Sequence, residues 1–168
     1  MRLTHQVEVI LTSSRDPSTR VRSFLNGLEF MIPSSLKINR GRRSISGVIE
    51  ASNILGARLL LVVSSRKGNP SKLVVYDLTL HSPLYEFKID GVTLLADFPS
   101  KYQMRVGSAC LGNLDPNCSL VNRMLIDLGV VKRRNCVYSV TTSTKENGCE
   151  VRFIGRDGQL VLGMRLVK

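Results

Sequence analysis

The sequence feature that most constrains the fold is a run of five apolar residues, LLLVV, at positions 59–63. The run is far shorter than the roughly 20 apolar residues of a membrane-spanning helix, and it has the length of a β-strand. A strand that is apolar at every position is buried on both faces, which is typical of a parallel sheet between two layers of helices. The run therefore predicts an α/β fold.

The residues around this run predict the order β-α-α-β-β for the first half of the chain. Residues 7–13 are rich in β-branched side chains and alternate in polarity, which is typical of a strand. A helix is expected to begin at Asp16, a good N-cap, with Pro17 at its first position, and to end before Pro33. The remaining expected elements are a basic loop at 36–44, a helix at 46–55, and strands at 58–64 and 72–79 joined by a basic turn.

The second half predicts more strands and one helix. After Pro83, strands at 84–89 and 92–98 are expected to form a hairpin through Asp90 and Gly91, a dipeptide that favours tight turns. Apolar residues that recur every three or four positions predict a helix at 119–128. A meander of three strands is expected at 136–142, 149–154 and 160–166, with turns at 147–148 and 157–158.

Charge is the main functional signal of the sequence. The 168 residues include 24 Lys and Arg against 13 Asp and Glu, which gives a formal net charge of +11. This excess favours a polyanionic partner, either nucleic acid or an anionic membrane surface, although a basic solvated surface that binds nothing would carry the same charge. Hydrophobic residues make up 43% of the chain and charged residues 22%, and this composition excludes a disordered protein.

Targeting signals and cysteines bear on the cellular compartment. The chain begins without the charged segment and apolar stretch of a signal peptide, so we expect a cytoplasmic protein that does not associate with membranes. Its four cysteines, at 110, 118, 136 and 149, include no Cys-x-x-Cys pair, and a zinc site is therefore not indicated. Buried thiols are the expectation in a reducing cytosol, and disulfides are the alternative if the source is a hyperthermophile.

The sequence argues against an enzyme. It contains no phosphate-binding loop, no Gly-x-Gly-x-x-Gly fingerprint and no Gly-x-Ser-x-Gly elbow. The two histidines, His5 and His81, stand in no recognisable catalytic pattern, and the carboxylates of the first half are too widely spaced for a two-metal site. Among these carboxylates, only Asp77 stands near the end of an expected strand, where a catalytic group could lie. We expect no catalytic residue, metal, cofactor or small-molecule substrate.

The densest basic cluster is the loop that precedes the second expected helix, with Arg40, Arg42 and Arg43. Arginine binds phosphate oxygens bidentately, and the amino end of a helix also favours an anion. If the strands at 7–13 and 58–64 are parallel, their carboxyl ends share one edge of the sheet. The helix that follows the basic loop leads into the opposite end of the second strand, so the helix begins, and the loop lies, at this same edge. The sequence therefore predicts that one rim holds six cations suited to a polyanionic partner: Arg15, Arg40, Arg42, Arg43, Arg66 and Lys67.

The same segments resemble the Brix domain family of ribosome-biogenesis proteins, most closely its archaeal single-domain members and its small-subunit processome member. The resemblance begins at ILTSSRDPS (10–18) and is strongest over INRGRRS (38–44) and GVIEAS (47–52). It continues through LLLVV (59–63) and RKGNP (66–70), and residues 39–70 are similar to the family's sigma-factor-like signature. Weaker similarity extends to YEFKI (85–89) and EVRF (150–153).

The resemblance implies a fold and a role. It implies a single Brix domain over 1–168, made of two similar α/β halves, 1–82 and 83–168, that share one compact unit. Each half would resemble the anticodon-binding domain of class II aminoacyl-tRNA synthetases. The implied role is non-catalytic binding of ribosomal RNA or its precursor, which assists RNA processing and subunit assembly, and the six cations of the basic rim would then be the RNA-binding residues. An alternative stays open, in which the domain docks on ribosomal or assembly proteins and its charge serves solubility.

Overall fold

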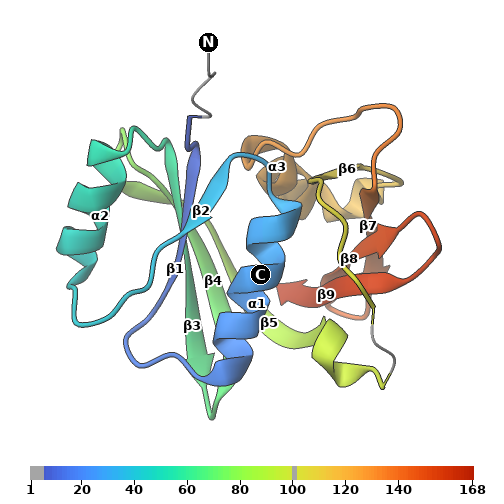
Figure 1. Ribbon diagram of the computed structural model, residues 1–168, viewed down its shortest axis with the longest axis horizontal. Coiled ribbons are helices and arrows are strands. Elements are labelled where there is room, and N and C mark those ends of the chain that lie inside the picture. Colours follow the sequence, from blue (N-terminus) through green and yellow to red (C-terminus); the bar gives the residue numbers. More distant parts are fainter. Residues whose placement is uncertain (1–5, 100–101) are drawn as a thin grey trace.

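The computed structural model describes residues 6–99 and 102–168 of the chain, so His5 lies outside the described residues. Within them, nine strands form one mixed sheet, in the order β2-β1-β3-β4-β5-β9-β8-β7-β6. Figure 1 shows that the first half of the chain builds one end of this sheet and the second half builds the other. The expected α/β class is confirmed.

Three parallel strands form the core of the amino-terminal end. β1 (Val9–Ser13) lies between β2 (Ser35–Lys37) and β3 (Leu59–Arg66) and pairs with both in parallel. The expected parallel arrangement of the first two predicted strands is thus confirmed. β2 overlaps the start of the segment expected to be a basic loop, 36–44, and three residues are too few for alternation to reveal a strand.

The apolar run in β3 is buried on both faces, as expected. Leu60 and Val62 pack with Val48 of α2 (Ile45–Ile54) on one face of the sheet. Leu61 and Val63 belong to the larger core on the other face, which α1 (Thr19–Met31) covers. The helix expected at 46–55 is confirmed as α2, but its apolar residues are only partly buried: Ile54, at its carboxyl end, is 79% exposed.

The first helix begins two residues later than expected. Ser18 is its N-cap, and the Ser18 hydroxyl accepts a hydrogen bond of 3.2 Å from the Val21 amide. Asp16 instead takes a left-handed conformation, with φ of 56°, in the loop that leads out of β1. The tertiary position of this loop therefore overrides the local capping preference of Asp16.

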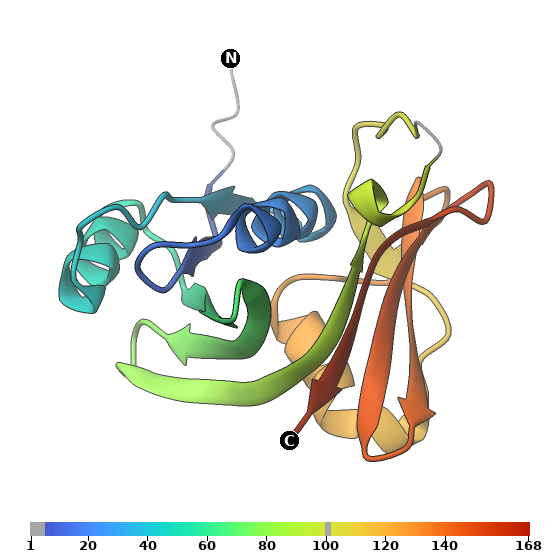
Figure 2. The same ribbon diagram turned by 90° about the horizontal axis from the view of Figure 1, so that it is seen from below.

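The hairpin expected at Asp90 and Gly91 is wrong. β4 (Asn69–Asp77) is followed by one long strand, β5 (Ser82–Leu94), which runs through both of these residues. The first part of β5 pairs with β4 and the second part with β9 (Leu160–Val167), with a register shift between Ile89 and Gly91. The dipeptide thus makes a bulge in a strand with neighbours on both sides, and Figure 2 shows this strand curving between the two ends of the sheet.

The carboxyl-terminal end of the sheet contains the expected helix and meander. α3 (Ser119–Asp127) lies between β6 (Ala109–Leu111) and β7 (Tyr138–Lys145), which are parallel to each other. β8 (Gly148–Gly155) and β9 complete an antiparallel meander. The two remaining elements are the short 3-10 helices η1 (Leu95–Asp97) and η2 (Pro116–Cys118).

The core continues through the whole sheet. Residues of α1, α3 and the strands of both ends belong to the same cluster of buried side chains. α1 lies so close to β9 that a Cβ on Gly27 would stand 3.3 Å from Leu162 Cδ1. The hydroxyl of Tyr85, on β5, donates to the Asp127 carboxylate at the end of α3, and burial together with this bond raises the pKa of Tyr85 to about 12. The boundary expected at 82–83 coincides with the start of β5, which joins the two ends.

The expectation of free thiols is wrong. Cys110 is bonded to Cys136, and Cys118 to Cys149. The folded chain brings the paired Cα atoms to 6.1 and 5.9 Å, within the range of about 4.4 to 6.8 Å that a disulfide requires.

None of the helices in the described part of the chain has the length and apolar character needed to cross a membrane.

Candidate nucleic-acid interface

Three segments meet where the parallel strands end. β1 ends at Ser13 and β2 at Lys37, whereas β3 continues three residues past Val63, the partner of Ser13. The segments that follow are the loop 14–18, the loop 38–44 and the turn between β3 and β4. Figure 1 shows them together at the lower end of these strands. This carboxyl edge is where open α/β sheets place their ligands.

Arg40 ties the loop 38–44 to the edge. Only 9% of Arg40 is exposed. Its Nη1 donates to the Ser13 carbonyl at 2.9 Å, and its Nε donates to the Arg43 carbonyl at 2.8 Å. Burial, with a smaller contribution from the charge of Arg15, lowers the pKa of Arg40. Arg40 therefore positions the loop, and Arg15 lies near enough for its charge to act on the Arg40 guanidinium.

The rest of this loop is exposed. Arg42 and Arg43 extend into solvent, just ahead of the N-cap of α2. That N-cap is Ser44, whose hydroxyl accepts a hydrogen bond of 3.2 Å from the Gly47 amide. Gly41 takes the left-handed conformation, with φ of 55°, that lets the chain turn between Arg40 and Arg42. The loop therefore presents two free guanidinium groups on a fixed backbone.

A hollow of about 510 Å³ opens beside the loop. Arg40 and Arg42 line it, together with two cations that sequence reasoning missed, Arg22 and Lys37. Asp16 is the one carboxylate in its wall. Lys37 was missed because β2 was not recognised, and Arg22 because nothing in its own sequence context shows which side of α1 faces the loop.

The remaining two predicted cations lie on a neighbouring part of the edge. Arg66 ends β3, and Lys67 forms the tight turn with Gly68, with φ of 51° and 81°. The Ser18 hydroxyl donates to the Gly68 carbonyl at 2.6 Å, which holds this turn against the amino end of α1. Arg66 and Lys67 line a separate hollow of about 390 Å³. Four of the six predicted cations thus line two separate hollows at this edge, whereas Arg15 and Arg43 line neither of them.

We call this surface the basic edge. It comprises the six predicted cations and the two that the structure adds: Arg15, Arg22, Lys37, Arg40, Arg42, Arg43, Arg66 and Lys67.

Asp77 and His81, which were considered for catalysis, both lie at the turn between β4 and β5. The Asp77 carboxylate accepts hydrogen bonds from the Thr79 and Leu80 amides, at 2.8 and 2.9 Å, and so shapes the turn between β4 and β5. His81 follows in that turn with φ of 54°. No group of three or more metal-ligating side chains occurs among the residues that the structure describes.

A mixed α/β sheet with a cationic carboxyl edge defines a class of protein suited to polyanions, and comparison with known proteins identifies the family. A "Probable Brix domain-containing ribosomal biogenesis protein" of Sulfurisphaera tokodaii is 41% identical over 138 residues, which cover 82% of this chain and 77% of the relative. A protein of the same name from Saccharolobus solfataricus is 36% identical over 152 residues, 89% of each chain. The chain belongs to the Brix domain-containing ribosomal biogenesis proteins.

Solved structures agree with this assignment. A probable ribosomal biogenesis protein from Aeropyrum pernix K1 superposes with a TM-score of 0.76 and 26% identity, covering 96% of both chains. An archaeal Imp4-like protein has a TM-score of 0.70 at 20% identity, covering 94% of this chain and 95% of its own, which shows a shared fold. No model of a protein family matches the chain. The relatives are named as biogenesis factors and not as enzymes, which supports the expectation of a non-catalytic protein.

Proposed function

We propose that this protein is a non-catalytic factor of ribosome biogenesis that binds ribosomal RNA or its precursor through the basic edge. In this role it assists RNA processing and subunit assembly in the cytoplasm. The names of the archaeal relatives support the pathway. A further relative, the U3 small nucleolar ribonucleoprotein protein IMP4 of Homo sapiens, is 34% identical over 92 residues, and its name describes it as a ribonucleoprotein component.

The observation that carries the RNA-binding proposal is the burial of Arg40. A guanidinium that is only 9% exposed is costly to desolvate, and here it is used to fix a loop whose outer residues are also arginines. Clustered arginines on a fixed backbone match the phosphates of a polyanion without much loss of conformational entropy. Aromatic residues make up 5% of the chain and Trp is absent, so base stacking is a minor part of this binding.

We also infer that the chain is a single Brix domain with related halves, 1–82 and 83–168, each similar to the anticodon-binding domain of class II aminoacyl-tRNA synthetases. The support is a recurring pattern of pairing. β1 and β3 are parallel and β4 and β5 follow in antiparallel order, whereas β6 and β7 are parallel and β8 and β9 follow in the same way. Superposition of each half alone on anticodon-binding domains tests this inference.

Salt dependence of RNA binding tests the proposed function. Each phosphate neutralised on a single strand contributes about −0.7 to the slope of log affinity against log salt, so four to six contacts give roughly −3 to −4. Changing Arg42 and Arg43 together to Ala should flatten the slope by about 1 to 1.5. The fold should survive, because both side chains are exposed.

The matched control removes two other exposed arginines, Arg133 and Arg134, which lie in the loop before β7. Titration of wild type and both double variants with a ribosomal RNA fragment at several salt concentrations gives the comparison. An equal loss in the two variants would mean that net charge alone attracts RNA. Unchanged RNA binding after loss of Arg42 and Arg43 would favour the alternative, a module that docks on ribosomal or assembly proteins.

A further inference from the structure

We infer that bound RNA continues from the basic edge across the open face of the sheet into a second basic hollow, lined by Arg66, Lys88, Lys145 and Arg165. We call this second site the central hollow. This inference rests on the proposed function and extends its binding surface to residues of the carboxyl-terminal strands.

The central hollow is continuous with the basic edge. It has a volume of about 420 Å³, and segments far apart in the sequence meet in it: the β3–β4 hairpin, the bulge of β5, the end of β9 and the β7–β8 hairpin. Arg66, Ser71, Ile89 and Asp90 line both this hollow and the neighbouring one that contains Lys67. A polyanion held at the tip of the β3–β4 hairpin therefore reaches the central hollow without leaving a basic surface.

The register of the strands places two lysines side by side on the exposed face. Lys72 on β4 is directly opposite Lys88 on β5, and Lys88 is opposite Val167 near the end of β9. Like charges at directly opposite positions destabilise a sheet. Lys72 is compensated by Glu86, with Nζ and Oε1 2.6 Å apart, whereas Lys88 makes no ion pair within the described ranges 6–99 and 102–168. A bound anion would compensate the remaining charge, that of Lys88.

The β7–β8 hairpin is held against the end of β9. At Gly148 an added Cβ would lie 2.6 Å from the Leu166 carbonyl oxygen, so glycine permits a close approach of the two backbones. Gly148 is the cross-strand partner of Lys145, and the contact therefore holds Lys145 at the rim of the hollow. β5 and β7 are three strand spacings apart in the sheet, about 14 Å at roughly 4.8 Å a spacing, so Lys88 and Lys145 line opposite sides of the hollow.

The charge balance of the central hollow favours an anion. Four cations line it against two carboxylates, Asp90 and Glu146. Arg165 is paired with Asp90, and Lys145 lies 3.7 Å from Glu150. Arg66 and Lys88 form no ion pair among the described residues. We take the anion to be RNA because Arg66 belongs to both this hollow and the basic edge.

The test compares three double variants that each remove two cations: Lys88→Ala with Lys145→Ala, Arg42→Ala with Arg43→Ala, and the control Arg133→Ala with Arg134→Ala. Each is titrated with the same ribosomal RNA fragment between about 50 and 200 mM salt. By the single-strand slope, six phosphate contacts make wild-type affinity fall about 300-fold over this range, and loss of two contacts reduces this fall to about 50-fold. We expect that reduction for the first two variants, and a larger one when their four changes are combined.

The outcomes separate the two proposals. If the Lys88 and Lys145 variant behaves like the control while the Arg42 and Arg43 variant loses affinity, the central hollow is overturned and the basic edge stands. If neither differs from the control, RNA binding through the basic edge fails as well. Ultraviolet crosslinking of RNA to the unmodified protein gives a second reading. Crosslinks in 85–90 or 145–148 support the central hollow, and crosslinks confined to 13–44 contradict it.

Discussion

Two loops occupy comparable places in this molecule and are fixed by opposite chemistry. One leads into α2 beside the parallel strands β1 and β3, and the other leads into α3 beside the parallel strands β6 and β7. The first is tied to the end of β1 by a buried cation, Arg40. The second is tied to the end of β7 by a carboxylate, Asp115, and to the start of β8 by a covalent bond between Cys118 and Cys149. We call the second region the disulfide corner.

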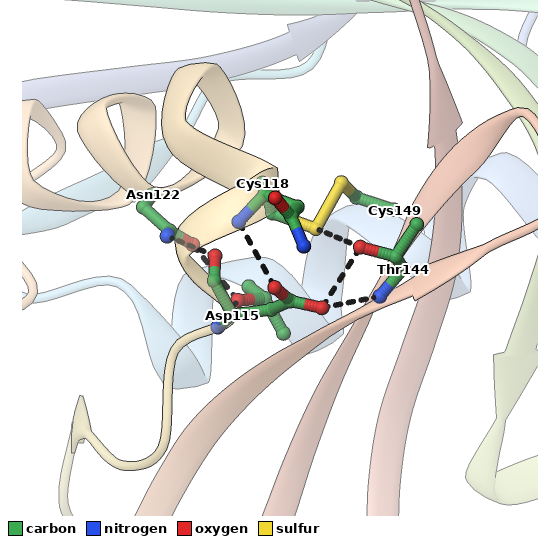
Figure 3. Close-up of a disulfide and its surroundings, with 7 residues drawn as sticks. Asp115, Cys118, Asn122, Thr144 and Cys149 are labelled. Atoms are coloured by element: carbon green, nitrogen blue, oxygen red, sulfur yellow. Dashed lines mark hydrogen bonds between the residues drawn. A yellow bond between two sulfur atoms is a disulfide. The ribbon is translucent and has the colours of Figure 1, made fainter.

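Figure 3 shows the polar contacts of the disulfide corner. The Asp115 carboxylate accepts from the Thr144 amide at 2.9 Å, from the Thr144 hydroxyl at 2.8 Å and from the Asn117 amide at 2.9 Å. The Cys118–Cys149 bond links η2, just before α3, to β8. The loop before α3, which is fixed by a carboxylate and a disulfide, contains no cluster of arginines. The loop before α2, which is fixed by the buried guanidinium of Arg40, also carries the exposed Arg42 and Arg43. The same strand arrangement thus carries a cationic surface at one end of the sheet and a disulfide-bonded, hydrogen-bonded loop at the other.

The largest expected effect comes from removing the disulfide of the corner. The Cys118–Cys149 bond spans 31 residues, and loop-closure entropy assigns about 4 kcal/mol to a bridge of this length. Changing both cysteines to Ala should therefore lower the melting temperature by roughly 10 °C or more, measured by calorimetry. RNA affinity at a temperature where the variant is folded should stay within about twofold of wild type. A variant that melts like wild type, or one that loses RNA binding while folded, would break the comparison.

Arg40→Ala should act on the other loop and change both stability and binding. Hydrogen bonds from a charged donor contribute about 1.5 to 3 kcal/mol, and the change leaves the Ser13 and Arg43 carbonyls without their donor. We expect a free energy of unfolding lower by about 2 kcal/mol in denaturant titrations, together with weaker RNA binding, because the loop is no longer fixed. The control is Arg42→Ala, which should weaken binding with a stability change of at most about 0.5 kcal/mol. Equal free energies of unfolding for the two variants would show that Arg40 does not fix the loop to the end of β1.

The smallest expected effect is the contribution of Asp115, in the disulfide corner, to the pH dependence of stability. Hydrogen bonds from the Asn117 amide and from Thr144 lower the pKa of Asp115. Because the folded pKa lies below the unfolded value of about 3.9, the stabilisation is present above about pH 4 and is lost as pH falls through the folded pKa. Asp115→Asn should therefore lose less stability than wild type on acidification below about pH 4, measured by melting temperature. The pKa of Asp97 is also lowered, chiefly by Arg20, but Asp97 is present in both proteins, so their difference reports Asp115. Parallel pH curves would contradict this prediction.

Particular elements show how far sequence reasoning reached. The apolar run at 59–63 correctly predicted a strand buried on both faces, because a pattern of this kind reflects burial directly. Asp90 and Gly91 were misread, because a dipeptide cannot tell a turn from a bulge when the neighbours of the strand are unknown. The thiols were misread for a similar reason. Cys110 and Cys136 are 26 residues apart, and only the fold decides that they meet.

The sequence by itself determined the α/β class, most of the helices and strands, and a basic excess concentrated around three loops, because these depend on local propensity, periodicity and composition. The tertiary structure decided which of those cations are free. Arg40 is buried while its neighbours Arg42 and Arg43 are exposed, and Arg22 and Lys37 join the site from elements whose orientation is not local. The physical reason is that the direction of a side chain in a sheet or at its edge follows from strand register, and register is fixed by partners distant in the chain.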